Sequence, residues 1–501
     1  MNDTRTLRGR LSTVVAVATA LALAVALLTP SASAADPAQS RGGPVEERAR
    51  ITEAVHDYVV EFFPLWLVYQ QTRLDPSNSL VGPREITPAY RSVVAINDDT
   101  LYASTPVDLS SGPVVLTTPA APTEVTYSVL TLSPFGNVFD SGIRGHRAGD
   151  ASEEVVYALV PPGYSGSPAV PDGATVIEML YEFSLLIFRI DKFTGTTDLT
   201  SEAETVRRNL RLLPLEDYAP GSDDGATRLL PVETFGIPFK SVADGLIERD
   251  PIAWLRQLQE AVGSEIVPPL TARQAGMVAA FDDVFGDGGT AVAPRNRRAF
   301  ARAAQDAHQA IIDNYLDNRD GGNWIHFTDI GTWDADQSLD RSSIAEYIQW
   351  GNSIATSAYY HAFLDVDAKQ LKASTRNGYV LTFPADDLPE AERFWSVTAY
   401  TPETIELIDN PADKYVVASY DDPEPNADGS ISIHIAQDRP RGVPASNWLP
   451  VTSDPFNVML RIYGVVAHSD VATNDYRPPP IERVRHGPGV GRAGSMTASR
   501  P

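Results

Sequence analysis

The chain contains no cysteine in its 501 residues, which excludes disulfide bonds, thiol catalysis and cysteine-ligated metal sites. Its eight histidines form no HExxH or HxH pair, so the pattern supports no zinc site. No G-x-S-x-G motif occurs, and the glycine-rich segment 286–289 has no P-loop lysine. These absences argue against the common serine-hydrolase and P-loop phosphate chemistries, and we predict no metal and no cofactor.

Positive charge is also scarce, with 40 Lys and Arg against 65 Asp and Glu and a formal net charge of −25. Binding to phosphate backbones or to anionic membrane surfaces requires clustered Lys and Arg. We therefore expect no nucleic-acid partner. We interpret the excess of acid as a solubility feature of an extracellular protein.

Residues 1–34 have the pattern of a secretory signal peptide. Three arginines precede an apolar run over residues 11–28, and Ala32-Ser33-Ala34 is a small-residue cleavage motif. An uncleaved anchor is the alternative, because about 18 apolar residues can just span a bilayer. The motif favours cleavage near Ala34 and predicts a secreted protein that starts at Ala35. No later run is long and apolar enough to span, so no membrane association is expected after cleavage.

Apolar runs over residues 95–144 alternate with turn signals about every ten residues, which is typical of consecutive antiparallel strands in a sandwich or barrel. The β pattern extends to Ile190 and returns after residue 379, and helices are predicted between, including one over 342–360. In the strand 394–400, Trp395 and Val397 should face one side of the sheet and Phe394 and Ser396 the other. The predicted organisation is a flexible lead (35–48), a helix plus first β domain (49–215), a loop and helical segment (216–370), a C-terminal β domain (371–477) and a disordered tail (478–501).

Ordered short motifs run through both β regions. In the first they are Phe63-Pro64-Leu65, Asn97–Tyr102, Val107–Leu109, Pro113–Leu116, Tyr127-Ser128, Asn137–Phe139 and Arg189-Ile190. In the second they are Tyr379–Pro384, Phe394–Thr398, Asp409–Pro411, Asp428–Ser430, Asn447–Pro450 and Leu460–Tyr463. With them the chain resembles a bacterial family that pairs a domain of unknown function 1254 with a domain of unknown function 1214. The resemblance implies a mainly β fold with helical insertions (α+β), in which a helical segment joins two jelly-roll-like β-sandwiches. It implies no catalytic residue.

Polar residues at turns and strand ends are the candidate binding groups. Asn97 and Asp99 could offer oxygens to a ligand or metal, or could cap a turn by bonding their own backbone. Trp448 could stack on a ligand or could anchor the core. Arg189 and Arg461 each interrupt an apolar strand, and a buried arginine must be paired, so each either forms a structural ion pair or binds an anion. The candidate set is Asn97, Asp99, Tyr102, Asn137, Arg144, Asn447, Trp448 and Arg461.

We expect a binding or assembly role, with a ligand cleft at the domain junction where the two groups of candidates would face each other. The alternative is a secreted hydrolase or lyase that uses carboxylate acid/base chemistry on a polar small molecule or glycan. Whether the protein is an enzyme stays open, as does homo-oligomer formation. The shared site requires Asp99 to lie near Arg461. If Asp99 binds the ligand, Asp99→Asn should weaken binding and leave stability nearly unchanged.

Overall fold

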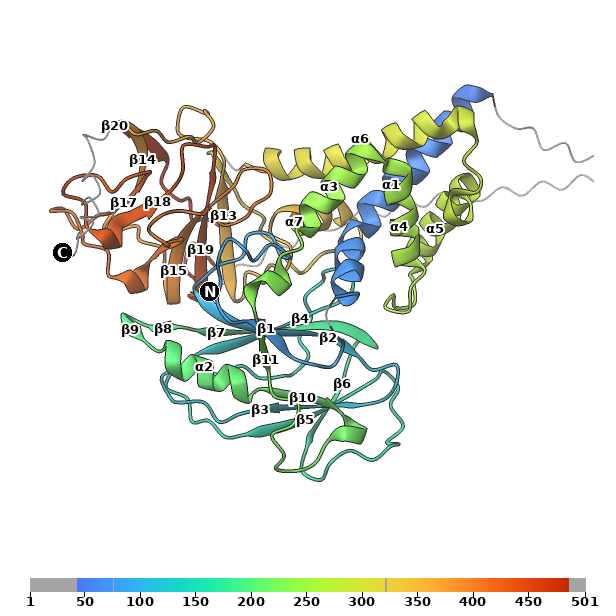
Figure 1. Cartoon of the computed structure of the whole chain (residues 1–501), viewed down its shortest axis with the longest axis horizontal. Helices are drawn as coiled ribbons and strands as arrows, with labels where there is room; N and C mark the ends of the chain where they lie inside the picture. Colours follow the sequence, from blue (N-terminus) through green and yellow to red (C-terminus); the bar gives the residue numbers. More distant parts are fainter. Residues whose placement is uncertain (1–42, 75, 320–321, 486–501) are drawn as a thin grey trace, which may run out of the picture.

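The structure is a computed structural model, and it describes residues 43–74, 76–319 and 322–485. The predicted signal peptide, the predicted mature N-terminus and residues 486–501 lie outside the described residues. The fold is mixed α+β with several sheets, which confirms the predicted class. Figure 1 shows its three regions: one pair of sheets at the bottom, a second pair at the upper left, and helices at the upper right.

The first β unit consists of two sheets whose strands lie between residues 81 and 230. A 22-residue hydrophobic cluster that includes Leu116, Leu159, Leu186 and Phe188 draws on both sheets. Helix α2 (Thr200–Asn209) adds Ala203 and Val206 to this cluster. The five-stranded sheet has the order β11 (Arg228–Leu230), β1 (Val81–Pro83), β2 (Thr100–Asp108), β7 (Phe183–Asp191) and β4 (Tyr127–Leu132). The four-stranded sheet has the order β10 (Arg211–Pro214), β3 (Val114–Thr118), β5 (Val155–Val160) and β6 (Thr175–Glu178), and β8 (Phe193–Thr194) pairs with β9 (Thr197–Asp198) beyond the end of β7.

The second β unit lies between residues 324 and 485 and also has two sheets around a shared cluster, which includes Leu381, Val397, Ile433 and Leu460. Its five-stranded sheet has the order β12 (Trp324–Ile325), β13 (Ser357–Ala362), β19 (Asn457–Val465), β15 (Ala391–Tyr400) and β16 (Val416–Ala418). Its four-stranded sheet has the order β18 (Trp448–Pro450), β17 (Ile431–Ala436), β14 (Asn377–Phe383) and β20 (Ile481–Arg485).

The two units repeat one strand arrangement. In the first unit β7 lies between β2 and β4, and in the second β19 lies between β13 and β15, with all four pairings antiparallel. In the other sheets, β3–β5 and β14–β17 are antiparallel, whereas β5–β6 and β17–β18 are parallel. The edge pairs β10–β3 and β20–β14 correspond as well. Strands that occupy equivalent places can therefore be compared residue by residue.

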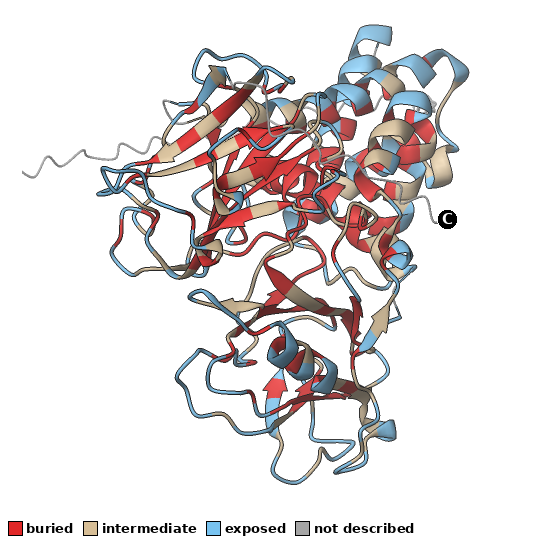
Figure 2. Cartoon of the chain, turned by 60° about the vertical axis from the view of Figure 1, so that its left-hand side comes forward, coloured by how far each residue is buried: buried red, intermediate tan, exposed pale blue. Residues whose placement is uncertain are grey.

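The helices form a bundle beside the two units. Thr271 begins one of them with a capping box, in which its hydroxyl accepts from the Gln274 backbone and its backbone donates to Gln274. The bundle buries Trp66, Trp254 and Phe300 in a cluster that also includes Leu185 and Ile187 of β7, so the bundle packs on the first unit. Its members are α1 (Pro44–Thr72), α3 (Phe239–Arg249), α4 (Pro251–Val262), α5 (Ala272–Phe285), α6 (Arg297–Asp317) and α7 (Ser338–Tyr347). Figure 2 shows buried residues along the inner sides of these helices and through the second unit.

Three sequence-based boundaries are corrected by the structure. The predicted lead is helical from Pro44, because a proline at the first helical position and acidic Glu46 and Glu47 in the first turn favour a helix start. The predicted tail is ordered over β20, which pairs with β14. The helix predicted over 342–360 ends at Tyr347, and β13 begins ten residues later because it pairs with β19.

Side-chain alternation is confirmed where it was predicted. Trp395 and Val397 of β15 enter the cluster of the second unit, while Phe394 and Ser396 face away from it. The same alternation explains the arginines. In β7, Leu186 and Phe188 face the cluster of their own unit and Arg189 faces outward, and in β19 Arg461 faces outward between Leu460 and Ile462. The outer faces of the two five-stranded sheets meet at the junction of the units.

Candidate anion site at the junction of the two β units

A pocket lies at this junction, with a cavity volume of about 80 Å³. The outer faces of β2 and β7 form one wall, and Tyr359, Arg461 and Tyr463 of β13 and β19 form another. The segment of residues 92–97 before β2, and Ile348 and Trp350 after α7, add to the lining. The remaining lining residues are Gln71, Pro83, Tyr90 and Phe235. We call this cavity the junction pocket. It is at the domain junction where a ligand cleft was expected.

Both outward-facing arginines line the junction pocket, and both are buried, with Arg189 7% and Arg461 2% exposed. They occupy equivalent positions in the repeated arrangement. Arg189 lies in register between Tyr102 of β2 and Ser128 of β4. Arg461 lies in register between a tyrosine, Tyr359 of β13, and a serine, Ser396 of β15. Each unit thus contributes one Tyr–Arg–Ser row to the junction.

Each arginine is anchored by hydrogen bonds to the other unit. Arg189 donates from Nη1 to Oδ1 of Asn352 (2.6 Å) and from Nη2 to the carbonyl of Trp350 (2.8 Å), just before β13. Arg461 donates from Nη2 to the carbonyl of Ala95, just before β2. The Nη1 atom of Arg461 is buried without a hydrogen-bond partner. The guanidinium of Arg461 therefore retains an unused donor.

Neither guanidinium has a carboxylate oxygen within 4.0 Å among the described residues. Burial disfavours the charge of Arg461, yet the surrounding Tyr400, Tyr463 and Asp99 hold the pKa of its guanidinium above the ordinary value. Arg461 is therefore charged in the pocket. Both arginines are hydrogen-bonded mainly to neutral oxygens. Of the two roles that the sequence left open, a structural ion pair and anion binding, neither arginine has the first among the described residues.

Asn97 links the two units across the pocket. Its Oδ1 accepts from the hydroxyl of Tyr102 (2.8 Å), and its Nδ2 donates to the hydroxyl oxygen of Tyr463 (2.5 Å). Burial raises the pKa of both phenols, so both are neutral at physiological pH. Because Tyr463 accepts from Asn97, its own O–H remains available to donate toward a ligand.

The rest of the lining is largely apolar and includes Val93, Ile96, Leu185, Ile187 and Trp350. None of the described residues that line the pocket is an Asp, Glu, His or Lys. The pocket therefore offers positive charge and neutral donors, but no side chain that exchanges a proton readily near neutral pH.

The structure brings Asn97, Tyr102 and Arg461 together at the junction pocket. Asp99 lies beside it, fully buried, and its carboxylate accepts from the hydroxyls of Ser396 (2.7 Å) and Tyr420 (2.6 Å) of the second unit. Asp99 therefore ties the units together and is not itself part of the pocket lining.

The other four candidates lie elsewhere. Asn137 closes a tight turn with Ser133, and Arg144 is exposed on the first unit. Asn447 bonds the backbone of Glu424 and Ser432, and the indole of Trp448 donates to Ala436, all within the second unit. That leaves Asn447 and Trp448 with contacts that hold the second unit together.

The predicted set does not include Arg189, Tyr359 and Tyr463, which line the pocket, or Asn352, which anchors Arg189. Arg189 is unusual as a charged residue in an apolar strand, and Tyr463 can be found from the sequence because it is two residues from Arg461 and so faces the same side. Tyr359 and Asn352 gave no usable signal, because that segment resembles a helix in the sequence.

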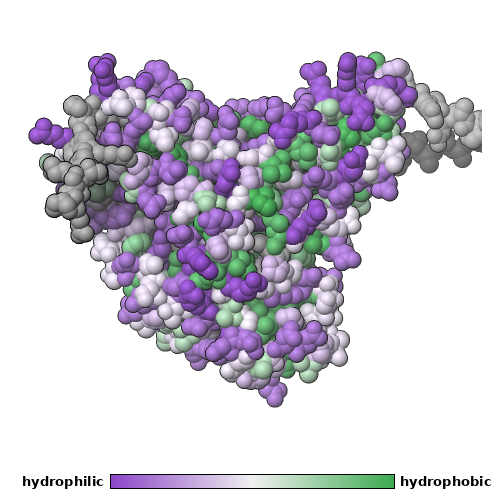
Figure 3. Space-filling view, in the orientation of Figure 1, coloured by the Kyte–Doolittle hydropathy of each residue, from purple (hydrophilic) through white to green (hydrophobic). Residues whose placement is uncertain are grey.

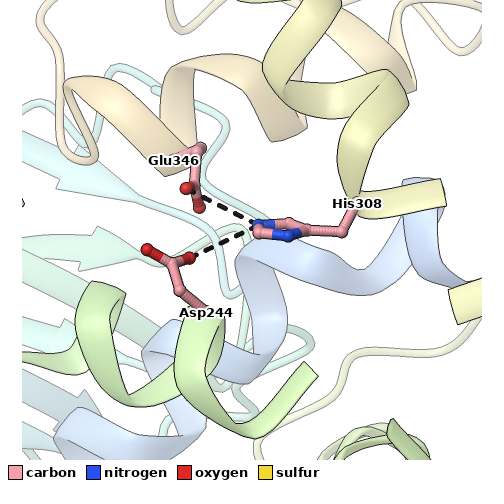
Figure 4. Close-up of side chains that lie close together, drawn as sticks. All are labelled: Asp244, His308 and Glu346. Atoms are coloured by element: carbon pink, nitrogen blue, oxygen red, sulfur yellow. Dashed lines mark ion pairs between the residues drawn. The ribbon is translucent and has the colours of Figure 1, made fainter. Parts of the chain in front are cut away.

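A second polar group, not predicted from the sequence, lies inside the helical bundle (Figure 4). Atoms of Asp244 on α3, His308 on α6 and Glu346 on α7 lie within 4.8 Å of one another, as metal ligands do. The ammonium of Lys240 already contacts both carboxylates, at 2.9 Å from Asp244. Burial would raise the pKa of Glu346, but Lys240 and His308 lower it overall. A lysine thus supplies the positive charge that a metal would bring, so we interpret this group as a structural charge cluster.

Comparisons with known proteins agree with this division of the chain. Residues 77–214 match the family described as protein of unknown function DUF1254, and residues 356–466 match protein of unknown function DUF1214. No curated protein matches the chain. The VPA0106 protein from Vibrio parahaemolyticus has a similar fold, with a TM-score of 0.54 and 18% identity over 87% of this chain and 100% of that one. An uncharacterised protein from Burkholderia cenocepacia aligns with a TM-score of 0.42 and 14% identity over 88% and 95% of the two chains. No helix among the described residues is both long and apolar enough to cross a bilayer.

Proposed function

Because this chain belongs to the family that joins a DUF1254 domain to a DUF1214 domain, whose descriptions give no activity, we propose its function from the junction pocket: it binds a small organic anion there. The observation that carries the proposal is the buried Arg461, whose Nη1 has no partner while the guanidinium lines the cavity. A buried charge is stable only when a counter-charge or hydrogen bonds compensate it. A ligand carboxylate supplies both.

The chemistry of the lining specifies the ligand further. A carboxylate matches the planar guanidinium and accepts two hydrogen bonds from it, and the Tyr463 hydroxyl adds a neutral donor. The apolar side chains around it suit a short hydrocarbon body. A cavity of about 80 Å³ holds roughly five to eight water-sized groups, at 10–15 Å³ for each. These features favour a small molecule over a glycan.

The same lining favours binding over catalysis. The alternative of a hydrolase or lyase requires a carboxylate that exchanges protons with the substrate, and the described residues that line the pocket offer none. An assembly role finds less support. Large exposed apolar side chains are spread over separate elements, such as Val45, Val176, Ile237 and Val366, and much of the face in Figure 3 is hydrophilic.

Two further parts of this proposal concern the fold and the location. Each pair of sheets is a jelly-roll-like sandwich; a shared cluster inside each pair and the repeated strand order support this. The protein is exported and cleaved near Ala34, which the basic, apolar and small-residue pattern of residues 1–34 supports. An extracellular protein would meet small organic acids directly.

Calorimetric titration of the mature protein tests the binding proposal. Butyrate and succinate should bind, whereas their neutral amides should not. Arg461→Gln should weaken the binding of both acids about tenfold to a hundredfold, because hydrogen bonds to a charged group contribute about 1.5–3 kcal/mol. The matched control is Arg144→Gln, which removes an exposed arginine and should leave the affinities for both acids unchanged. Affinities weaker than about 10 mM for every acid, or equal affinity in Arg461→Gln, would contradict the proposal.

A further inference from the structure

We infer that the ligand of the junction pocket is a dianion, a small dicarboxylate, with one acid group held by Arg189 and the other by Arg461. This inference rests on the proposed function and deepens it. It comes from the repeated architecture, because the two units contribute equivalent cationic rows to a single cavity.

The equivalence extends beyond the two arginines. Arg189 and Arg461 lie on the central strands of the matched three-strand sets β2–β7–β4 and β13–β19–β15. Each has a tyrosine in register on the first strand of its set, Tyr102 or Tyr359, and all four side chains line the pocket. A pocket built from two equivalent walls presents similar chemistry at two places, and a ligand with two like ends matches it.

The anchoring of the arginines is reciprocal. Each guanidinium bonds the segment just before the first strand of the other unit's set: Arg189 bonds Trp350 and Asn352, and Arg461 bonds Ala95. These bonds fix the positions of both guanidinium groups before any ligand arrives. The cost of ordering two long side chains is therefore met within the free protein, which favours binding.

The charges of the pocket favour two negative groups over one. Two buried guanidinium groups line the cavity, and neither has a carboxylate oxygen within 4.0 Å among the residues that the structure describes. The nearby Asp99 raises the pKa of Arg461 through its charge, but its oxygens accept from Ser396 and Tyr420. A monocarboxylate would leave one guanidinium without a counter-ion in a site with little water, whereas a dicarboxylate gives each its own.

The size of the cavity limits the length of the dicarboxylate. Room for roughly five to eight water-sized groups corresponds to a dicarboxylate of about two to four carbons, because the four carboxylate oxygens occupy part of that room. Its methylene groups would contact Val93, Ile96 and Ile187, which lie among the lining residues. Affinity should therefore pass through a maximum along the series malonate, succinate, glutarate and adipate, and should fall at adipate.

The test compares succinate with succinamate, which has nearly the same shape but replaces one carboxylate by a neutral amide. Both are titrated calorimetrically into the mature wild-type protein and into Arg189→Gln, Arg461→Gln and the exposed control Arg144→Gln. We expect succinate to bind at least tenfold more tightly than succinamate to the wild type and to the control. In either pocket variant this ratio should fall toward one, because a single guanidinium cannot distinguish a second carboxylate.

The outcomes separate this inference from the proposed function. If wild-type protein binds succinate and succinamate equally well, the dianion inference is wrong and the anion-binding proposal stands. If neither acid binds, the proposed function itself fails. Because the decisive ratio is measured on wild-type protein, the test holds even if an arginine variant does not fold. A ratio unchanged in a folded Arg189→Gln variant would also overturn the inference.

Discussion

Replacing Asp99 with asparagine should destabilise the protein, because Asp99 joins the two β units at their junction. The side chain is 0% exposed, and its two oxygens accept from the hydroxyls of Ser396 at 2.7 Å and Tyr420 at 2.6 Å. The ring of Tyr420 also stacks on Phe193 of the first unit, with centroids 4.1 Å apart. Asparagine keeps one oxygen and replaces the other by an NH2 group, which cannot accept a hydrogen bond from a hydroxyl.

The magnitude follows from the two hydrogen bonds. A bond to a charged group contributes about 1.5–3 kcal/mol, and a buried donor left without an acceptor costs about 1–3 kcal/mol. Asp99→Asn removes one acceptor and turns the other bond into a neutral one. The buried Arg461 also loses a nearby negative charge. We therefore expect the free energy of unfolding to fall by about 2–4 kcal/mol.

Urea unfolding followed by circular dichroism measures this loss. The control is Asp172→Asn on the exposed surface, which should stay within about 0.5 kcal/mol of the wild type. In a double-mutant cycle, Tyr420→Phe should cost less in the Asp99→Asn background than in the wild type, with a coupling of about 1 kcal/mol or more. A change below about 0.5 kcal/mol for Asp99→Asn would refute the structural role and would return Asp99 to the ligand candidates.

Three more outcomes follow from other parts of the chain. Burial lowers the pKa of His361 from 6.5 to about 3; the unfolded chain therefore binds this proton first as pH falls below 6.5, and about 2–3 kcal/mol of stability should be lost by about pH 4.5. Urea unfolding at pH 6.5 and pH 4.5 should show a smaller loss of stability in His361→Gln than in the wild type, whereas the exposed control His56→Gln should lose as much as the wild type. Equal losses in His361→Gln and in the wild type would contradict the account. Lys240→Met should cost about 3–5 kcal/mol in the same assay, because it leaves the buried carboxylate of Glu346 without its ammonium partner, and Lys240→Met with Glu346→Gln should recover part of it; a wild-type melting temperature lowered by a chelator would instead indicate a metal. Mass spectrometry of the secreted protein should find Ala35 as its first residue, and an intact N-terminus in the membrane fraction would rule out cleavage.

The sequence alone was sufficient for several central strands and for the arginines within two of them. The run Phe394–Tyr400 is rich in aromatic and β-branched residues, so its strand could be predicted, and the period of two residues in a strand then assigns its faces. Arg189 and Arg461 stood out because a charged residue in an apolar strand requires a partner. Because successive side chains of a strand point to opposite faces, the position of each arginine in its strand also determines which face of the sheet it lies on.

The partners of those arginines could not be predicted in the same way. Asn352 and Tyr359 lie in a segment of small and aromatic residues that fits a helical period, and β13 forms there because β19, about a hundred residues later, pairs with it. Register between distant strands decides that Tyr359 is opposite Arg461. No local pattern contains that information.

Turn chemistry misled the choice of the remaining candidates. Asn137, Arg144, Asn447 and Trp448 occur near strand ends. Polar side chains at such positions can either bind a ligand or form hydrogen bonds to nearby backbone. In the structure Asn447 and Trp448 bond nearby backbone, which is the commoner role. The difference between the two roles is set by which strand ends meet at the junction, and that depends on how the two units pack.

A crystal structure of the mature protein grown in saturating succinate would test the central claim most directly. Electron density for succinate should fill the junction pocket, with one carboxylate within hydrogen-bond distance of Nη1 of Arg461 and the other beside the guanidinium of Arg189. A pocket that contains only water under these conditions, or arginines that have turned to pair with carboxylates of the protein, would contradict the claim.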